Sequence, residues 1–415
     1  MIPFSSFALD NGLKVFVHED PTVQIAVMNI LYDVGSRDER PDKTGFAHLF
    51  EHLMFGGSVN IPNYDDPLQL VGGENNAFTN TDITNYYLTV PASNIETGFW
   101  LESDRMLSLS FDPQVLEVQR KVVIEEFKQR YLNQPYGDVW LKLRPLVYTT
   151  HSYQWATIGK DISHIEHATL DDVRDFFFKY YIPNNAILVV AGNVTVDQVK
   201  QLSEKWFGPI PAGVKPERKI QTEPKQLNKR STEIKANVPA NALYKAYHMP
   251  GRFDHDYHAY DLLSDILSRG DSSRLYNTLV KEKEMFTSIS SFTMGTIDPG
   301  LIVISGRIKD GIDLKDADRE VDLILEEVMK NGVTNDELQK VKNQALVALE
   351  FGEVELINRA MNIAFYALSG DAALVNEDEA RINSVTTDDI HRIAKSVFVE
   401  NNASVMYYQA ENKNQ

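Results

Sequence analysis

The chain has 415 residues, 43% of them hydrophobic and 24% charged, which is typical of a folded globular protein of roughly two to four domains. Its formal net charge of −18 argues against nucleic-acid binding, which needs clustered Lys and Arg, and a solvated acidic surface is the ordinary explanation. Because the chain contains no cysteine, disulfides and thiolate nucleophiles are excluded, and a metal site would have to use His, Asp and Glu.

The first residues, MIPFSSFALDNG, lack the basic and apolar regions of a signal peptide. No apolar run approaches the roughly 20 residues that a membrane-spanning helix requires. We therefore expect no membrane segment and a cytoplasmic location. The alternative is a periplasmic protein whose signal peptide has been removed.

The first predicted elements are strands. LKVFVHE (residues 13–19) and IAVMNILYDVG (25–35) are rich in β-branched and aromatic residues and are bounded by Asn-Gly and Pro signals. Further along, NIETGFWLESDRML (94–107) and DADREVDLILEEVMKNG (316–332) have the apolar period of amphipathic helices, and the second ends at Asn-Gly, a reasonable helix end.

The segment FAHLFEHLMFGGS, residues 46–58, carries three polar side chains on an apolar or small background. In a helix His48, Glu51 and His52 share one face, because positions i, i+3 and i+4 are neighbours. Two neutral imidazoles at this spacing suit zinc, and the glutamate between them can accept a proton without being a ligand. The order is H-x-x-E-H, the inverse of H-E-x-x-H. A chance pair of buried histidines is the alternative, but it leaves three polar groups in need of partners.

The next segment, GGENNAFTNTDITNYYLTV (residues 72–90), begins with a Gly-Gly turn or bulge and continues with the Thr, Tyr and β-branched residues of a strand. An exposed strand edge can pair with an extended peptide through main-chain hydrogen bonds. An ordinary core-packing strand is the alternative.

A catalytic zinc usually has three protein ligands, so a third is expected from elsewhere in the same half. The helical stretch EVQRKVVIEEFKQR, residues 117–130, offers Glu125 and Glu126. Spacing alone does not choose between them, and glutamates on a charged helix are commonly exposed to solvent.

Two segments offset by 217 residues, 169–189 and 386–406, repeat one pattern. Each has a Thr N-cap with an acidic first turn, a helix, an Asn-Asn turn and a β-rich run, from which we infer a duplication. The basic segment 212–231 contains two prolines and no apolar period, and is the expected linker between residues 1–211 and 232–415. The mixture of strands and helices predicts two homologous α+β domains, each a mainly antiparallel sheet covered by helices.

Taken together, these motifs resemble the insulinase-like, or pitrilysin, family of zinc metallopeptidases, and in particular its short members of the processing-peptidase type. The resemblance covers nearly the whole chain. It rests on the H-x-x-E-H motif, on residues 72–87, on VVIEEFKQRYLNQPYG (122–137) and on SSRLYNTLVKE (272–282). It implies an N-terminal catalytic domain that binds zinc and a homologous C-terminal domain without the zinc motif.

The resemblance also implies roles for single residues. The third ligand of the family lies in a Val-Val-x-x-Glu segment seventy-odd residues after the second histidine, which corresponds to Glu126 here. The implied site is Zn²⁺ bound by His48, His52 and Glu126, with Glu51 as the general base toward a zinc-activated water.

By the same resemblance, Asn76, Ala77, Phe78 and Thr79 form a substrate-binding edge beside the zinc. His151, in HSYQW, is similar to a position in the wall of the site, and we expect it to be structural and not a ligand.

Two departures from the family pattern affect these expectations. Gln119 stands seven positions before the third ligand, where relatives often carry an acid. Val280 and Thr287 stand where the large members present an Arg and a Tyr, and neither provides a charged or phenolic donor. Arg274 and Tyr276 lie nearby, but we expect them to be structural.

We therefore expect a homo- or heterodimer with a similar chain, in which the partner supplies the missing donors and the two chains enclose a chamber. The expected function is that of a zinc metalloendopeptidase hydrolysing peptides or unfolded segments. One alternative is a non-catalytic or partner-dependent subunit of a peptidase-like assembly, which the retained zinc residues disfavour. Another is a zinc hydrolase with non-peptide substrates, which the strand edge disfavours.

Overall fold

The computed structural model describes residues 1–411, and the chain forms two compact units. The N-terminal unit contains residues 1–130, 155–221 and 351–377, and the C-terminal unit contains the remainder. The units therefore do not coincide with two consecutive stretches of chain, because two segments are exchanged between them. The division at residues 212–231 stays a prediction about the duplicated halves.

The N-terminal unit is built on a six-stranded sheet with strand order β1-β2-β6-β3-β5-β4, in which only β2 and β6 are parallel neighbours. Its strands are β1 (Ser5–Ala8), β2 (Lys14–Glu19), β3 (Ile25–Tyr32), β4 (Glu74–Thr79), β5 (Thr84–Pro91) and β6 (Ala186–Gly192). Its helices are η1 (Ser36–Asp38), α1 (Phe46–Leu53), α2 (Asp65–Leu70), η2 (Ala92–Asn94), α3 (Ile95–Leu107), α4 (Pro113–Phe127), α6 (Ile162–Glu166), α7 (Leu170–Tyr180), η5 (Pro183–Asn185), α8 (Val196–Trp206), α12 (Leu356–Leu368) and η7 (Ala372–Asn376).

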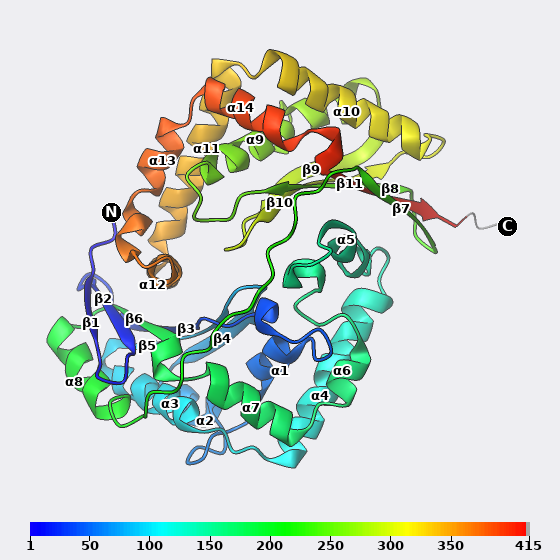
Figure 1. Ribbon diagram of the computed structural model, residues 1–415. Coiled ribbons are helices and arrows are strands. Elements are labelled where there is room, and N and C mark those ends of the chain that lie inside the picture. Colours follow the sequence, from blue (N-terminus) through cyan, green and yellow to red (C-terminus); the bar gives the residue numbers. More distant parts are fainter. Residues whose placement is uncertain (412–415) are drawn as a thin grey trace. The chain divides into compact units, whose positions relative to one another are not determined.

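Helices cover both faces of this sheet, which explains why β3 is buried along almost its whole length. Helices α3 and α8 contact β5 and β2, and α12 contacts β6, β3 and β2 from the opposite face (Figure 1). On the face of the sheet that carries the rings of Tyr32 and Tyr86, the ring of Phe50 from α1 stacks on the ring of Tyr181. The two ring centroids are 5.3 Å apart. This aromatic packing holds α1 against the sheet.

The C-terminal unit is built on a five-stranded sheet with order β7-β11-β8-β10-β9, in which only β7 and β11 are parallel. Its strands are β7 (Arg230–Ala236), β8 (Ala242–Met249), β9 (Phe286–Met294), β10 (Gly300–Ile308) and β11 (Ala403–Ala410). Its helices are α5 (Val139–Val147), η4 (Ser152–Gln154), α9 (Tyr257–Ser268), the π-helix η6 (Tyr276–Glu282), α10 (Leu314–Asn331), α11 (Asn335–Val354, its last turn in the other unit), α13 (Asp378–Ser384), α14 (Thr387–Val397) and η8 (Glu400–Asn402). The π-helix η3 (Lys128–Leu132) directly follows α4 at the boundary between the units.

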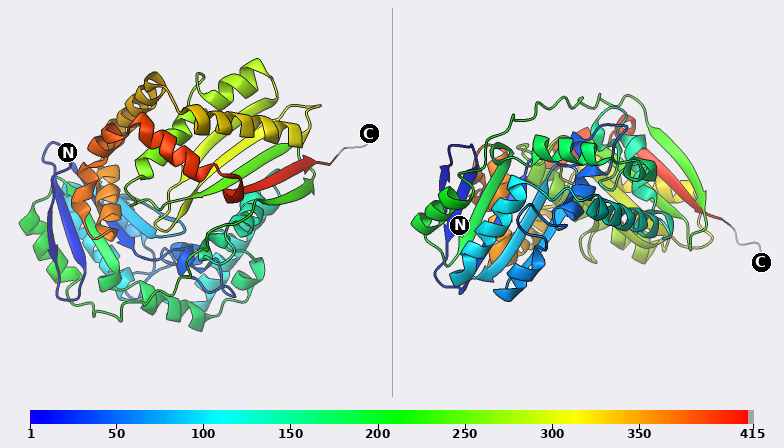
Figure 2. Two further views of the ribbon diagram at one scale, coloured as in Figure 1. Left: turned by 45° about the horizontal axis from the view of Figure 1, so that its top comes forward. Right: turned by 90° about the horizontal axis from the view of Figure 1, so that it is seen from below.

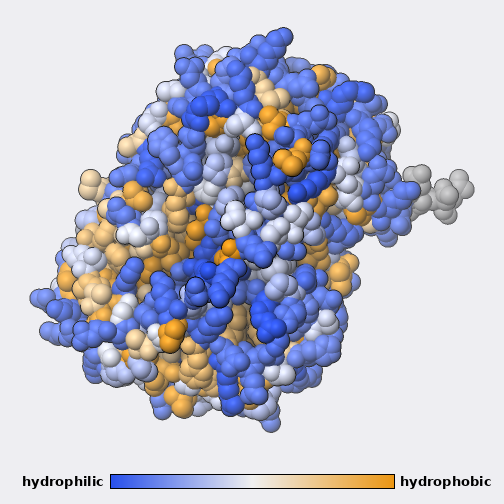
Figure 3. Space-filling model, viewed as in Figure 1, coloured by the Kyte–Doolittle hydropathy of each residue, from blue (hydrophilic) through white to orange (hydrophobic). Residues whose placement is uncertain are grey.

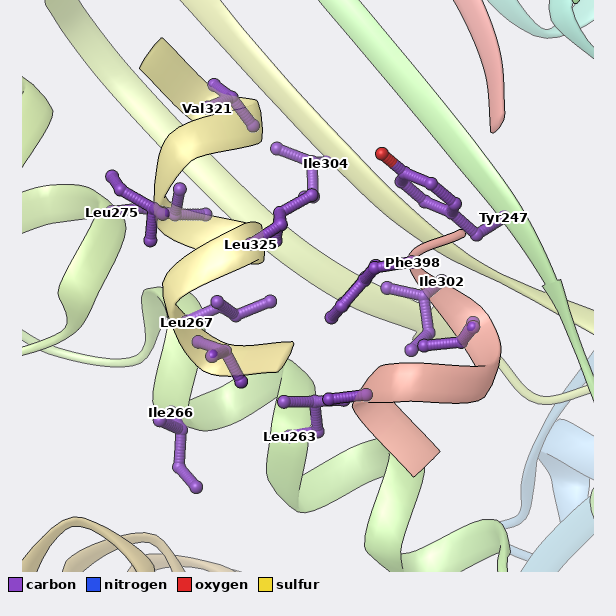
Figure 4. Close-up of a cluster of buried hydrophobic side chains, with 14 of the residues drawn as sticks. Tyr247, Leu263, Ile266, Leu267, Leu275, Ile302, Ile304, Val321, Leu325 and Phe398 are labelled. Atoms are coloured by element: carbon purple, nitrogen blue, oxygen red, sulfur yellow. The ribbon is translucent and has the colours of Figure 1, made fainter. Parts of the chain in front are cut away.

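Alternate residues of the second sheet point into two separate cores, as the two-residue period of a strand requires. On β10, Ile302 and Ile304 pack with side chains of α9, α10 and α14, a cluster drawn in Figure 4. Their neighbours Leu301 and Val303 pack on the other face, against α5. The sheet is thus buried between layers of helices.

The two sheets share one strand order once β1 is set aside, and their local contacts repeat as well. Thr169 and Thr386 both close a capping box, with Asp172 and Asp389 respectively. The amide of Asn402 donates to a backbone carbonyl five residues before it at 2.9 Å, and Asn185 does the same. The predicted fold class, two homologous α+β domains with mainly antiparallel sheets, is confirmed.

Each sheet takes a helix from the other half of the chain. Helix α5 precedes the linker but packs on the second sheet, and α12 follows the linker but packs on the first. Arg359 of α12 bonds Asp20 at the end of β2, with Nη1 and Oδ2 2.9 Å apart. The sequence repeat gave no sign of this exchange.

The linker segment predicted at residues 212–231 has no helix or strand before β7 and runs as an extended chain (Figure 2). It is nevertheless bound along its length. Arg218 donates to the carboxylates of Asp33 and Asp38, and Glu223 accepts the backbone N–H groups of residues 149–151. The face in Figure 3 is mainly hydrophilic, with smaller apolar areas. No helix within residues 1–411 is both long and apolar enough to cross a membrane.

Candidate metal centre

Helix α1 presents the H-x-x-E-H residues because its opposite face is buried. Leu49, Phe50 and Leu53 are at most 5% exposed and pack into the N-terminal unit. His48 and His52 are turned away from that core, and their side chains are 13% and 23% exposed to solvent, respectively. The apolar period predicted from the sequence thus sets which side of the helix carries the polar groups.

Helix α4 brings the third polar group to the same place. Asp112 caps its N-terminus by accepting the N–H of Gln114 at 2.7 Å, with Pro113 in the first position. Leu116, Val123 and Phe127 are its buried residues, and the helix packs against α1. Glu126, near its C-terminal end, therefore faces the histidines.

The three side chains converge on one point. Oε2 of Glu126 lies 3.5 Å from Nε2 of His48 and 3.6 Å from Nε2 of His52. Within residues 1–411, this is the one group of three or more His, Asp or Glu side chains whose ligand atoms all lie within 4.8 Å of one another. The structure brings together all three residues predicted as metal ligands.

These distances fit shared coordination better than hydrogen bonding. They exceed the usual N–H···O range of about 2.7–3.2 Å. Two atoms bonded to one tetrahedral zinc at about 2.0–2.1 Å would lie about 3.3 Å apart, close to what is found. The residues present therefore fit a zinc ion in both chemistry and spacing.

His48 and His151 differ in their hydrogen bonding. Nδ1 of His48 is buried without a hydrogen-bond partner in the described part of the chain. In His151, by contrast, Nε2 lies 3.3 Å from Oδ2 of Asp298 and Nδ1 accepts the N–H of Tyr153. His151 is held as a structural histidine and belongs to no metal-binding group within residues 1–411.

The protonation states favour metal binding. Burial lowers the pKa of His48 to about 4, so its imidazole is neutral at pH 7, and the Glu126 carboxylate only partly opposes that shift. The pKa of Glu126 is lowered by the imidazole of His52 and by His48, against the effect of burial, so this carboxylate is ionised. Neutral imidazoles and an ionised carboxylate are the forms that bind zinc.

Glu51 has a different environment from Glu126. Burial raises the pKa of Glu51, while Thr79 and His52 oppose the shift. A carboxylate whose pKa is raised toward neutrality is a better proton acceptor and donor than an ordinary surface carboxylate. Thr79 ends β4, so the candidate base lies next to the strand predicted to bind substrate.

That strand, β4, is at the edge of its sheet, and among the described strands it pairs only with β5. Its residues alternate between exposed and half-buried, and Asn76, Ala77, Phe78 and Thr79 lie in its last four positions. Helix α1 contacts β4 directly. The four residues predicted as a substrate-binding edge thus form a free edge beside the helix that carries His48 and His52.

Sequence reasoning missed one neighbour of Glu126. Nη1 of Arg130 lies 2.9 Å from Oε1 of Glu126, the oxygen that does not face the histidines. The i,i+4 spacing was visible in the sequence, but nothing there showed which glutamate faces α1. Glu125 instead pairs with Lys128 at 2.8 Å, and its side chain is 59% exposed.

The structure also places the three residues that depart from the family pattern, Gln119, Val280 and Thr287. Gln119 is half-buried on α4, two turns before Glu126. Val280 packs against the core of the C-terminal unit, and the Thr287 hydroxyl donates to the carbonyl of Arg307. Arg274 is bound by Glu337 at 2.7 Å and by the carbonyl of Gly332, a structural arrangement.

Comparison with known proteins gives two family models that match separate parts of the chain. Residues 14–139 match "Insulinase (Peptidase family M16)", and residues 167–345 match "Peptidase M16 inactive domain". The first range contains the candidate metal centre, and the second contains most of the C-terminal sheet.

Similar proteins cover nearly the whole chain. The zinc protease PqqE of Helicobacter pylori is 28% identical over 97% of this chain and 92% of its own length. The zinc protease YmxG of Bacillus subtilis is 25% identical over 96% of both. The crystal structure of a protease from Helicobacter pylori superposes with a TM-score of 0.92 at 27% identity, covering 99% of this chain and 100% of that one. With both family models, full-length zinc protease relatives and a shared two-domain fold, this chain belongs to the insulinase family of peptidases, M16.

Proposed function

We propose that the chain is a zinc-dependent endopeptidase that hydrolyses peptides or unfolded segments. The observation that carries the proposal is the convergence of Glu126 on His48 and His52, with Glu51 on the same helix face. His48, His52 and Glu126 would hold the ion. A zinc ion in this place would supply a Lewis acid that acidifies water and polarises a carbonyl group.

In this proposal, Glu51 handles the proton. It accepts the proton of the attacking water and then delivers it to the amine of the leaving peptide. Burial raises the pKa of Glu51, which makes it easier for Glu51 to accept the proton. Glu51 lies on α1 with the two histidines and interacts with Thr79, the last residue of the candidate substrate strand.

The substrate class follows from β4. A free strand edge offers unpaired N–H and C=O groups, and only an extended chain can pair with them. A folded protein presents few such segments, so short or unfolded peptides are the expected substrates. The enclosed chamber that the family resemblance implies would narrow the choice further, and it stays a prediction.

A partner chain forms part of the proposal, because Val280 and Thr287 bring no charged or phenolic donor to stabilise an oxyanion. We propose a homo- or heterodimer with a similar chain that supplies those donors. Full peptidase activity of the purified chain at monomeric mass would contradict this part.

The test combines metal analysis with the cleavage of an unstructured peptide, using the chain alone and together with candidate partner chains. The wild-type protein should bind one zinc ion per chain and cleave the peptide. Glu51→Gln should keep the zinc and lose hydrolysis, because the amide cannot accept the proton. Normal cleavage by this variant would show that the assigned base is wrong.

The competing function is a non-catalytic subunit of a peptidase-like assembly. One observation favours it: residues 167–345 match a model described as an inactive domain. This range does not contain the candidate metal centre, so it describes the second half of such proteins and not the residues proposed for catalysis. Zinc binding without cleavage, alone or with any partner, would support the subunit.

A further inference from the structure

Helix α1 has no cap of its own. Its N-cap residue is Gly45, which has no side chain to accept a backbone N–H, and its φ of 88° lies in the left-handed region that glycine tolerates. A Cβ at this position would also meet the carbonyl oxygen of Ile158 at 2.6 Å. A Ser, Thr or Asp cap is therefore excluded here, and α1 is only eight residues long.

A residue six positions earlier supplies the missing acceptors. Oε2 of Glu39 accepts the N–H of Gly45 at 2.9 Å, and Oε1 accepts the N–H of Ala47 at 2.8 Å. Both oxygens of one carboxylate are thus used on the first turn of α1, immediately before His48. Glu39 is 7% exposed, and its two acceptor oxygens lie at the positive end of the helix.

The turn that carries Glu39 is itself tied to the substrate edge. In η1, the N–H of Ser36 donates to the carbonyl of Asn80 at 3.2 Å, and the N–H of Arg37 donates to that of Thr81 at 2.9 Å. Asn80 and Thr81 belong to the turn that follows β4. The approach is close, because a Cβ on Gly35 would meet backbone atoms of residues 81 and 82 at 2.6 Å.

From these contacts we infer that Glu39 is a positioning residue that fixes the metal-binding helix relative to the substrate strand. Its carboxylate holds the start of α1, and the backbone of its turn holds the end of β4. Without the carboxylate the first turn of α1 would fray, and His48 lies in that turn while His52 does not. The inference rests on the proposed zinc site, because it describes how one ligand of that site is placed.

The burial of Glu39 shows why a neutral replacement is a sharp test. Burial raises the pKa of Glu39, while the N–H groups of Ala47 and Gly45 oppose the shift. Glu39→Gln keeps the shape of the side chain but replaces one acceptor oxygen by an NH₂ group that would face a backbone N–H.

The control is a carboxylate cap of the same kind on a helix without the zinc motif. Asp313 begins α10 in the C-terminal unit and also accepts two backbone N–H groups, those of Lys315 at 2.8 Å and Asp316 at 3.2 Å. Asp313→Ala should lower thermal stability as a lost cap does, by about 1 kcal/mol. It should leave zinc binding unchanged.

The experiment measures the zinc affinity of metal-free, folded protein by competition with a chelator, together with thermal unfolding. Glu39→Gln should bind zinc about tenfold more weakly, the usual loss when a residue that orients a ligand is changed. Asp313→Ala should stay within about twofold of wild type. Wild-type zinc affinity in folded Glu39→Gln would overturn the inference, because a merely structural cap changes stability and not affinity.

If Glu39→Gln does not fold, Glu39→Asp takes its place, since it keeps the two acceptor oxygens and shortens the reach by one methylene. It should weaken zinc binding less than tenfold but measurably, and unchanged affinity would again overturn the inference. A wild-type chain that binds no zinc would instead contradict the proposed function. The two failures are therefore distinguishable.

Discussion

Oε2 of Glu126 lies 3.5 Å from Nε2 of His48, although 78 positions separate the two residues in the chain. The contact exists because α4 packs against α1 and because the last turns of α4 run past the exposed face of α1. The neighbouring Glu125 points to Lys128 and solvent. The packing of the two helices thus distinguishes two adjacent glutamates that, from the sequence alone, are equally good candidates for the third ligand.

The first prediction compares these two glutamates. Glu126→Gln should weaken zinc binding by more than about 100-fold, beyond the 10–100-fold range typical of residues that only orient a ligand. Glu125→Gln should change the affinity little, because its carboxylate is exposed and paired with Lys128. Chelator competition on both variants measures the difference, and equal losses would refute the choice of Glu126.

The second prediction concerns Arg130, which binds the outer oxygen of Glu126 at 2.9 Å. Arg130→Met should weaken zinc binding about tenfold, because Glu126 loses the group that orients its carboxylate. The Arg130 side chain is 70% exposed, so overall stability should change by less than about 1 kcal/mol.

Lys128→Met is the matched control for Arg130→Met. Lys128 follows directly on α4 and pairs with Glu125, so its loss removes a similar positive charge without touching Glu126. Zinc affinity should remain near the wild-type value. If both variants weaken zinc binding to the same extent, the cause is the general electrostatic field and not the contact with Glu126.

The third prediction tests the free edge of β4. The N–H of Ala77 donates to Oδ1 of Asn76 at 2.8 Å, so a bound peptide would have to displace that side chain to pair with this donor. Proline is tolerated at such edge positions but removes the donor. Ala77→Pro should fold and should lower kcat/KM for an unstructured peptide at least about tenfold, since a lost donor leaves the peptide unpaired.

Ala77→Ser keeps the backbone donor and should retain near-normal peptide cleavage. Circular dichroism and zinc affinity serve to show that both Ala77 variants keep the fold and the metal centre. If Ala77→Pro cleaves peptides as well as wild type, the outer edge of β4 does not bind substrate through this donor.

The fourth prediction uses the ion pair of Arg274 with Glu337. The hydrogen bond from Arg274 is the largest cause that lowers the pKa of Glu337, to about 2. A carboxylate whose pKa is lower in the folded state stabilises the protein above its unfolded pKa of about 4.5, and this contribution disappears as the pH falls toward 2. Glu337→Gln should therefore lower stability at pH 7 by about 1 kcal/mol, a value reduced for partial solvent screening.

Urea unfolding at pH 7 and pH 3 checks this pH dependence. The midpoint difference between wild type and Glu337→Gln should be clear at pH 7 and should shrink at pH 3. Glu350→Gln, on the exposed side of α11, should change neither midpoint. An undiminished difference at pH 3 would show that the carboxylate contributes through shape and not through charge.

Much of this protein could be predicted from local sequence. Strand and helix periods located β2, β3, α3 and α10, and the repeated Thr N-cap with its acidic first turn marked α7 and α14. These signals are local, because side chains at fixed spacings share a face whatever surrounds them. The same reasoning placed His48, Glu51 and His52 on one side of α1.

What depends on distant contacts could not be predicted in this way. The exchange of α5 and α12 between the sheets leaves no mark on the period of either helix, because an apolar face does not specify which sheet will cover it. The cap from Glu39 was missed for a related reason, since its partners Gly45 and Ala47 lie outside the i to i+3 spacing of an ordinary capping box.

The sequence by itself determined the chemistry available to this protein: two imidazoles and a carboxylate on one helical turn, no thiol, and a duplicated α+β unit. The tertiary structure decided which glutamate meets them, which arginine holds that glutamate, and which carboxylate holds the helix. The physical reason is that helical spacing fixes neighbours within one turn, whereas the distance between helices is set by how their apolar faces pack.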